Sequence, residues 1–229
     1  MKNLLTTVNV QVCEKLFLKD PESSELGKRI IMGSIEQIDK LGFEGYNFRK
    51  LANYIKTTEA SIYRYFESKN KVLLYLTSWY WSWMEYHLVF QITNVKSVEE
   101  RLKRAISLMT SIVEVDHINP HIDEKSLQRI VFSESMKAYM NKEVDQENKE
   151  GAFKNYKQFV GRVSEIIQEA SPNYKYPHML VSTVIEGAHL QHHFAKHLPS
   201  LTNITEEENT ISSFYLQVVL NTINNQSEA

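Results

Sequence analysis

The stretch FRKLANYIKTTEASIYRYFESK, residues 48–69, decides the fold of this chain. Apolar residues recur at helical spacing over residues 48–55 and again over residues 58–65, so each segment is expected to form a short helix. Only a few residues around Lys56 separate the two patterns, which leaves room for nothing longer than a tight turn. Two short helices joined in this way form a helix-turn-helix.

The composition favours a helical protein. A chain of 229 residues with 42% hydrophobic residues can bury a substantial core, and 7 glycines and 5 prolines are few for the turns of an all-β fold. The single cysteine, Cys13, excludes a disulfide framework and the multi-cysteine zinc modules, which suits a reducing compartment. No apolar run is long enough to span a bilayer, and the N-terminus lacks a basic segment followed by an apolar one. A cytoplasmic protein without a membrane partner is therefore expected.

The charges are unevenly distributed along the chain. Nine basic and five acidic residues lie between Leu26 and Tyr75, whereas the whole chain has a net charge of -2. This segment therefore carries an excess of four positive charges, and the rest of the chain an excess of six negative charges. A small basic module on an acidic body is typical of a protein that meets phosphates at one end and a different partner at the other.

The predicted secondary structure is helical after an N-terminal arm, residues 1–20, whose apolar residues alternate weakly. Asp20 or Ser23 is expected to cap a first helix that ends at Gly42. Further helices are predicted over residues 48–55, 58–65, 69–91, 98–115, 124–141, 152–170, 176–197 and 205–224. The predicted fold class is all-α, with a three-helix N-terminal domain joined through the long helix 69–91 to a helical bundle.

Several short motifs follow one another along residues 33–69 at characteristic distances in the sequence. They are Gly33-Ser34, Gly42-Phe43, Arg49-Lys50-Leu51-Ala52, Ser61-Ile62-Tyr63, Tyr65-Phe66 and Ser68-Lys69. On these motifs, residues 26–76 resemble the N-terminal domain of the tetracycline-repressor-like (TetR/AcrR) family of bacterial transcriptional regulators. The resemblance implies an arm over residues 1–20, a DNA-binding domain over 21–68, and an effector-binding and dimerisation domain over 69–229.

The resemblance also implies which residues touch DNA, because the second helix of a helix-turn-helix enters the major groove. Thr58, Tyr63 and Lys69 are expected to contact phosphates, and Arg49 a phosphate or a base. The residues expected near base edges are Glu59, Ala60, Ser61 and Arg64, although Glu59 could equally be a first-turn acid favoured by the helix dipole.

Lys56 departs from the family pattern, which usually has a glycine at this place in the turn. A left-handed backbone at a non-glycine residue costs about 1 kcal/mol or a little more. The turn, and with it the angle of the second helix, is therefore expected to differ slightly from the family pattern.

The helix 69–91 is rich in aromatic residues, which predicts either ordinary core packing or an apolar pocket for an effector. On the second interpretation, the pocket binds a small apolar or aromatic effector. The residues expected to line this pocket are Trp83, Met84, His87, Met109, Phe132, Met136 and Phe159.

The last two predicted helices are the expected homodimer interface, in the form of a four-helix bundle. The apolar residues assigned to it are Leu180, Val184, Ala188, Phe214, Val218 and Leu220. His189, His193 and His197 recur at every fourth residue, a spacing at which neighbouring histidines can share a metal ion. Because no cysteine supports such a site, the histidines are expected to pack in the interface and no metal is assigned.

The predicted function is that of a sequence-specific DNA-binding transcriptional regulator. The family points to an effector-responsive repressor that binds a palindromic operator as a homodimer. An enzyme is not expected, and no cofactor is assigned, because the chain has no Gly-rich phosphate loop, nucleophile elbow or paired-carboxylate motif. Two alternatives stay open: a metal-binding protein or enzyme built on the histidine stripe, and a partner-binding adaptor whose helix-turn-helix lacks DNA affinity.

Overall fold

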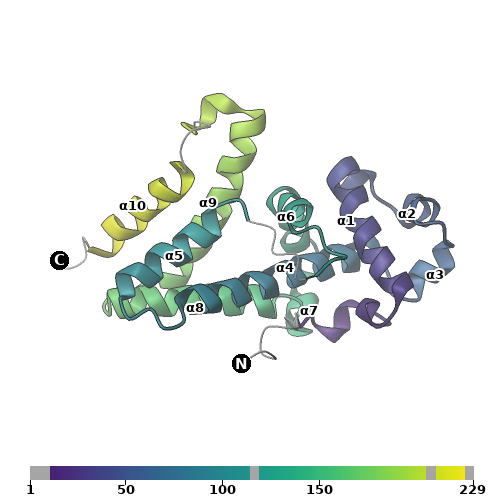
Figure 1. Cartoon of the computed structure of the whole chain (residues 1–229), viewed down its shortest axis with the longest axis horizontal. Helices are drawn as coiled ribbons and strands as arrows, with labels where there is room; N and C mark the ends of the chain where they lie inside the picture. Colours follow the sequence, from purple (N-terminus) through teal and green to yellow (C-terminus); the bar gives the residue numbers. More distant parts are fainter. Residues whose placement is uncertain (1–10, 114–118, 205–209, 225–229) are drawn as a thin grey trace. The chain divides into compact units, whose positions relative to one another are not determined.

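The computed structural model describes residues 11–113, 119–204 and 210–224, and within these ranges every regular element is a helix (Figure 1). This confirms the all-α fold. The α-helices are α1 Glu25–Gly45, α2 Phe48–Tyr54, α3 Glu59–Tyr63, α4 Lys69–Ile92, α5 Val98–Thr110, α6 Glu124–Tyr139, α7 Val144–Lys149, α8 Lys154–Ala170, α9 Pro177–His197 and α10 Thr210–Asn224. Three 3-10 helices complete the described elements: η1 Glu14–Leu16, η2 Pro21–Ser23 and η3 Pro199–Leu201.

The helix boundaries differ from the sequence prediction in a few places. Asp20 caps the short η2, and Ser24, rather than Asp20 or Ser23, caps α1. The helix α7 and the 3-10 helices were not expected, because each is too short to show a periodic pattern. The first half of the predicted arm, residues 1–10, and the start of the predicted last helix, residues 205–209, lie outside the described residues.

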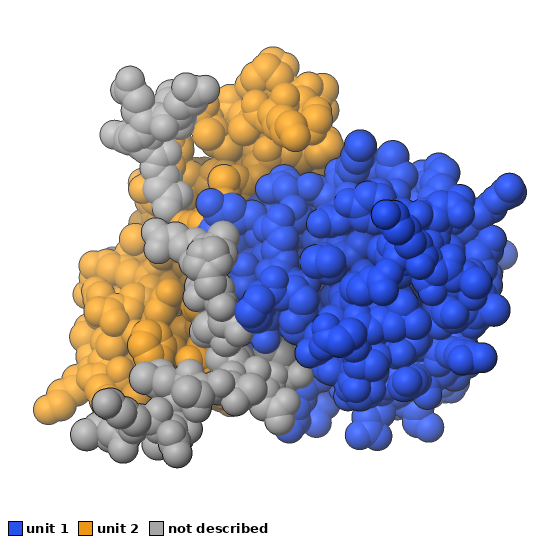
Figure 2. All heavy atoms as spheres, turned by 45° about the vertical axis from the view of Figure 1, so that its right-hand side comes forward, with its two compact units in different colours: residues 1–83, 113–156 blue, residues 84–112, 157–229 orange. Residues whose placement is uncertain are grey.

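The chain divides into two compact units, which Figure 2 colours separately. Unit 1 comprises residues 1–83 and 113–156, and unit 2 comprises residues 84–112 and 157–229. The segments expected from the sequence were bounded instead at residues 20 and 68. The difference arises because residues 113–156, which include α6 and α7, pack with the N-terminal helices.

The first part of α4 forms the centre of unit 1. All residues of α4 from Val72 to Trp81 are buried, as expected for a helix that is apolar on every side. Although α4 is strongly apolar, no helix in the described part of the chain is long and apolar enough to cross a membrane.

The helices α1 and α2 cross closely at Gly33. A Cβ atom at this position would lie 2.5 Å from Cγ2 of Ile55 and 3.1 Å from Cδ1 of Leu51. The neighbouring Ser34 is fully buried, and its hydroxyl lies 2.9 Å from the hydroxyl of Tyr46. The small pair Gly33-Ser34 therefore admits a crossing helix.

The helix α6 lies beside α1 in unit 1 (Figure 1) and is joined to it by polar contacts. The guanidinium of Arg129 donates two hydrogen bonds to the carboxylate of Asp39, at 2.9 and 2.7 Å. Further along, the backbone N–H of Phe43 donates to Oε1 of the buried Glu134 at 3.0 Å. Phe43 follows Gly42, whose φ of 70° breaks the regular helix, so this carboxylate receives an N–H group that the break leaves without a helical partner.

Unit 2 is built around α5, α9 and α10. Gly187 allows α9 to approach α10, because a Cβ atom there would overlap the hydroxyl of Tyr215. Thr110, at the end of α5, links all three helices: its hydroxyl lies 2.8 Å from the hydroxyl of Ser212, and its carbonyl lies 2.8 Å from Nε2 of His192.

The crossing at Gly33 predicts a large effect of a β-branched side chain. Gly33→Val should lower the free energy of unfolding by about 2 kcal/mol, because the added methyl groups overpack the α1–α2 contact. Urea denaturation followed by circular dichroism measures the change. Gly161→Ala in α8 is the control, since no atom lies within 4 Å of its added Cβ, and alanine favours a helix more than glycine does. Equal stability of Gly33→Val and the unchanged protein would contradict the close crossing.

Candidate nucleic-acid interface

The two short helices of residues 48–69 both begin with a side-chain cap. Oδ1 of Asn47 accepts a hydrogen bond from the backbone N–H of Lys50 at 2.9 Å, which fixes the start of α2. Oγ1 of Thr58 accepts from the backbone N–H of Ser61 at 3.2 Å and fixes the start of α3 in the same way. Both helices are shorter than predicted from the sequence, but their order and their starts agree with the prediction.

The turn between α2 and α3 has a left-handed residue at Lys56, with a φ of 54°. The backbone N–H of Thr57 donates to the carbonyl of Ala52 at 2.8 Å, and that of Lys56 donates to Asn53, in the arrangement of a Schellman motif. The turn therefore keeps a left-handed residue although a lysine occupies the family's glycine position.

Arg29 of α1 supports this turn, since its guanidinium donates a hydrogen bond to the carbonyl of Ile55 at the C-terminal end of α2. A cation near the end of a helix stabilises carbonyl groups that have no helical partner. Sequence reasoning missed this role of Arg29, because no local pattern links it to a residue 26 positions away.

The helix α3 buries one side and exposes the other. Ile62 is fully buried, and Tyr65 and Phe66 immediately after the helix are buried as well. The predicted DNA-contacting residues Glu59, Ala60, Tyr63 and Arg64 are exposed, Thr58 at the cap is exposed, and Ser61 is partly exposed. One face of α3 is therefore held by the core, and the opposite face is open to a large partner.

Two contacts fix side chains on this open face. The hydroxyls of Thr58 and Ser61 lie 2.9 Å apart, so both are positioned by the cap of α3. The ring of Tyr63 packs edge-on against Phe48 of α2, with centroids 4.9 Å apart, while 49% of Tyr63 remains exposed. Tyr63 is thus oriented before any partner arrives.

Basic residues lie at the starts of the helices on either side of α3 in the chain, α2 and α4. Arg49 is exposed on the first turn of α2. Lys69, the first residue of α4, donates a hydrogen bond to the carbonyl of Phe43 at 3.0 Å and lies 3.8 Å from Glu44. The ammonium group of Lys69 is only partly exposed, so a phosphate contact requires it to exchange at least part of this local pairing.

A sequence comparison identifies the family of the helix-turn-helix region. Residues 30–76, which run from α1 into α4, match the family model described as bacterial regulatory proteins, tetR family. The chain carries a tetR-family N-terminal domain over these residues. Proteins of this family are DNA-binding transcriptional regulators and not enzymes, which agrees with the prediction from the sequence. No curated protein matches the chain significantly.

Solved structures extend the likeness of fold beyond the residues that match the family model. A transcriptional regulator from Saccharomonospora viridis in complex with choline is 17% identical, with a TM-score of 0.58 and coverage of 88% of this chain and 97% of the other. A tetR-family regulatory protein from Rhodococcus RHA1 is 12% identical, with a TM-score of 0.59 and coverage of 87% and 97%. AibR in complex with isovaleryl coenzyme A and operator DNA is 16% identical, with a TM-score of 0.52 and coverage of 82% and 95%. At these identities the likeness establishes the fold.

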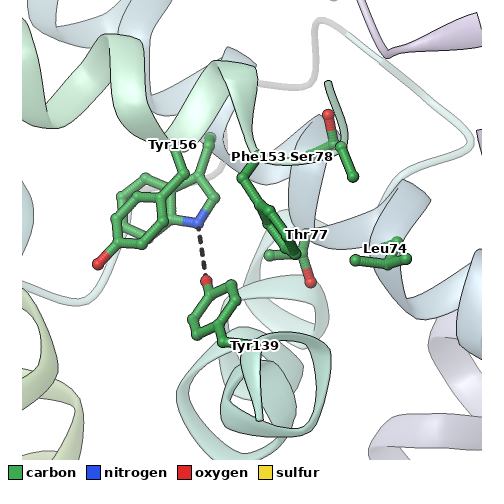
Figure 3. Close-up of a pocket in the computed structure, with 8 residues that line it drawn as sticks. Leu74, Thr77, Ser78, Tyr139, Phe153 and Tyr156 are labelled. Atoms are coloured by element: carbon green, nitrogen blue, oxygen red, sulfur yellow. Dashed lines mark hydrogen bonds between the residues drawn. The ribbon is translucent and has the colours of Figure 1, made fainter. Parts of the chain in front are cut away.

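Trp81 of α4 and three aromatic residues from later in the chain line a narrow hollow in unit 1 (Figure 3). Trp81 stacks on Tyr156 with centroids 4.4 Å apart, and its indole N–H donates to the hydroxyl of Tyr139 at 3.4 Å. The complete lining is Leu74, Thr77, Ser78, Trp81, Tyr139, Ala152, Phe153 and Tyr156. The hollow leaves no room for a water molecule, so a ligand could enter only if these side chains moved.

The seven residues predicted for the effector pocket do not line this hollow. Trp83, Phe132 and Met136 belong to unit 1, and Met84, His87, Met109 and Phe159 belong to unit 2. Trp83, Met84, Met109 and Phe159 are buried, whereas 42% of Met136 is exposed. The pocket assignment stays a prediction.

The residues predicted for the dimer interface differ in exposure. Leu180, Val184 and Ala188 of α9 are buried, so much of their apolar surface is already covered within one copy of the chain. In α10, by contrast, 52% of Phe214 is exposed, and Val218 and Leu220 are partly exposed. Only the α10 residues among the six therefore offer substantial surface to another protein.

The three histidines of the predicted stripe on α9 also differ in exposure. His189 is buried, and this burial lowers its pKa to about 3, so its imidazole is neutral at physiological pH. His193 and His197 are exposed, with ring centroids 4.6 Å apart. Among the described residues, no three side chains of histidine, cysteine, aspartate or glutamate meet in a group that could hold a metal ion.

The left-handed turn predicts that Lys56→Gly stabilises the regulator. The free energy of unfolding should rise by about 0.5–1 kcal/mol, because glycine adopts a positive φ without the steric cost that lysine has. Asn94, with a φ of 64°, provides a matched control, since asparagine already tolerates this conformation and Asn94→Gly should change little. Guanidinium denaturation of the three proteins measures both changes, and a destabilised Lys56→Gly protein would contradict the assigned strain.

Proposed function

We propose that this regulator is an effector-responsive repressor that binds a palindromic DNA operator as a homodimer, with α3 as its recognition helix. The observation that carries the proposal is the open face of α3, which is held from behind by the buried Ile62 and Phe66. Arg49 at the start of α2 and Lys69 at the start of α4 add basic residues on the neighbouring helices. A short exposed helix with cations on the neighbouring helices matches the major groove, in which base edges are bordered by phosphates on both sides.

The proposed roles follow from the geometry of the open face. Tyr63 and Lys69 contact phosphates, which fix the protein on the duplex without reading its sequence. Arg64 is exposed and long enough to reach a guanine or a phosphate, and Glu59 can accept a hydrogen bond from cytosine N4. Because a carboxylate is repelled by phosphates, Glu59 contributes to sequence preference rather than to affinity.

The helices α9 and α10 support the proposed dimer, but through different α9 residues from those chosen on sequence alone. Met179 and Leu190 of α9 are 66% and 53% exposed, and they lie on the stripe of α9 that also carries His193 and His197. With Phe214 of α10, they leave large apolar side chains in water that a second copy would cover in a four-helix interface.

The helix α4 supports the proposed response to an effector. It begins with Lys69 at the proposed DNA surface and carries Trp81 of the aromatic hollow three turns further along. A small apolar or aromatic molecule would release the operator only if it bound the DNA-incompetent conformation more tightly than the competent one. The neighbouring structures with choline and with isovaleryl coenzyme A show ligand complexes in this fold.

Selection from a pool of random-sequence duplexes tests the proposed function directly. The protein should enrich one short palindrome, and binding of that duplex should weaken steeply as salt increases, because phosphate contacts release counterions. Enrichment of no sequence, with no salt-dependent binding, would favour the adaptor that lacks DNA affinity.

Variants of the open face should bind DNA more weakly but keep the fold. Tyr63→Ala and Lys69→Ala should each weaken binding of the enriched duplex at least about tenfold, because each lost contact occurs twice in a dimer. Fluorescence anisotropy measures the affinity, and circular dichroism checks the helix content. Lys103→Ala in α5 is the control, since Lys103 is exposed and pairs with Glu99 in unit 2. Unchanged binding by both open-face variants would reject α3 as the recognition helix.

The dimer proposal has its own test. Leu190→Glu and Phe214→Glu should shift the molar mass in solution from two copies to one, because each places a carboxylate in the proposed apolar interface. Light scattering after size exclusion gives the mass. Leu198→Glu, which changes a leucine that is 47% exposed just beyond the end of α9, should remain dimeric. A dimer in both interface variants would place the interface elsewhere.

A further inference from the structure

The described part of the N-terminal arm is an ordered part of unit 1, although it lies outside the residues that match the family model. Leu16 is 1% exposed, and the ring of Phe17 packs edge-on against Tyr75 of α4, with centroids 6.1 Å apart. Residues 16–18 of the arm therefore have a fixed position beside the helix-turn-helix.

The arm is fastened at the C-terminal end of α3. The backbone N–H of Leu18 donates to the carbonyl of Tyr65 at 2.8 Å. The hydroxyl of Tyr65 lies 2.7 Å from the hydroxyl of Ser24, which caps α1. Since Tyr65 directly follows the exposed Arg64, these two contacts hold residues 18–24 next to the end of the proposed recognition helix.

Lys19 lies at this junction. Its side chain is exposed, and its ammonium nitrogen lies 5.1 Å from the ring centroid of Tyr65. The hydrogen bond from Ser24, together with the nearby ammonium of Lys19, lowers the pKa of the Tyr65 phenol, which is consistent with a positive potential at this end of α3. Arg64 adds a second positive charge near the same phenol.

The acidic residues of this segment are engaged with other partners. The carboxylate of Asp20 accepts the N–H of Glu22, and Glu22 itself contacts Tyr75 and His121. Glu25 pairs with Lys28 at 3.2 Å. Within the described ranges, no carboxylate forms an ion pair with Lys19 or Arg64, so both cations are available to an anionic partner.

A recognition helix in the major groove has sugar-phosphate backbones near both of its ends. Within the family domain, the residues proposed to contact some of these phosphates are Lys69, Arg49 and Tyr63. We propose that Lys19 binds a DNA phosphate beside the C-terminal end of α3, as a contact that the N-terminal arm adds together with Arg64. The inference rests on the proposed role of α3, and it extends the DNA surface beyond the family domain.

A salt titration with Lys19→Ala tests this contact. The probe is a labelled 40-base-pair duplex of arbitrary sequence, which suffices because phosphate contacts do not depend on sequence. Loss of one phosphate contact lowers the slope of log affinity against log salt by about 0.9 for each protomer, and it weakens binding about five- to tenfold per protomer at 0.1 M salt. Lys19→Arg should restore most of the affinity.

Lys15→Ala is the matched control, because Lys15 is exposed on the same arm but lies close to Glu150. It should bind the duplex like the unchanged protein. The contact at Lys19 is rejected if the slope and affinity of Lys19→Ala equal those of Lys15→Ala while the unchanged protein binds DNA. Failure of the unchanged protein itself to bind duplex DNA would instead reject the proposed function, so the two outcomes are distinguishable.

Discussion

The close crossing of α1 and α2 at Gly33 is the contact on which the rest of the DNA-binding surface depends. It places Ile55 against α1, and Arg29 of α1 then holds the carbonyl of Ile55 at the end of α2. These contacts fix the point from which the chain turns into α3. The left-handed conformation of Lys56 follows from this geometry, because α3 must leave α2 at a sharp angle to present its open face.

Phe43 connects this surface with the part of the chain that follows the family domain. Its N–H is bound by Glu134 of α6, and its carbonyl is bound by Lys69 of α4. Lys137 of α6 lies 3.3 Å from Glu44, the carboxylate that Lys69 also approaches. The contacts of Lys69 in unit 1 therefore depend on α6. A DNA phosphate has to compete with these contacts for the ammonium group of Lys69.

Much of the fold and part of the site could be predicted from the sequence, because the signals are local. The helical spacing of residues 48–55 and 58–65 and the irregular position at Lys56 can each be recognised from a few neighbouring residues. The α9 stripe that is buried within one chain could not be predicted, because apolar residues occur on more than one side of that helix. The contact between Arg29 and Ile55, and the position of the arm, also escaped prediction, since each joins residues far apart in the sequence.

On the proposed function, α3 enters the major groove of a duplex. Methylation of guanine N7 by dimethyl sulfate reports on this groove directly, because N7 lies on its floor. With the duplex enriched by the protein, guanines should be protected in two patches whose centres are about one helical turn, roughly 34–36 Å, apart. Full methylation of guanine N7 on protein-bound duplex, with protection confined to adenine N3 in the minor groove, would contradict the account.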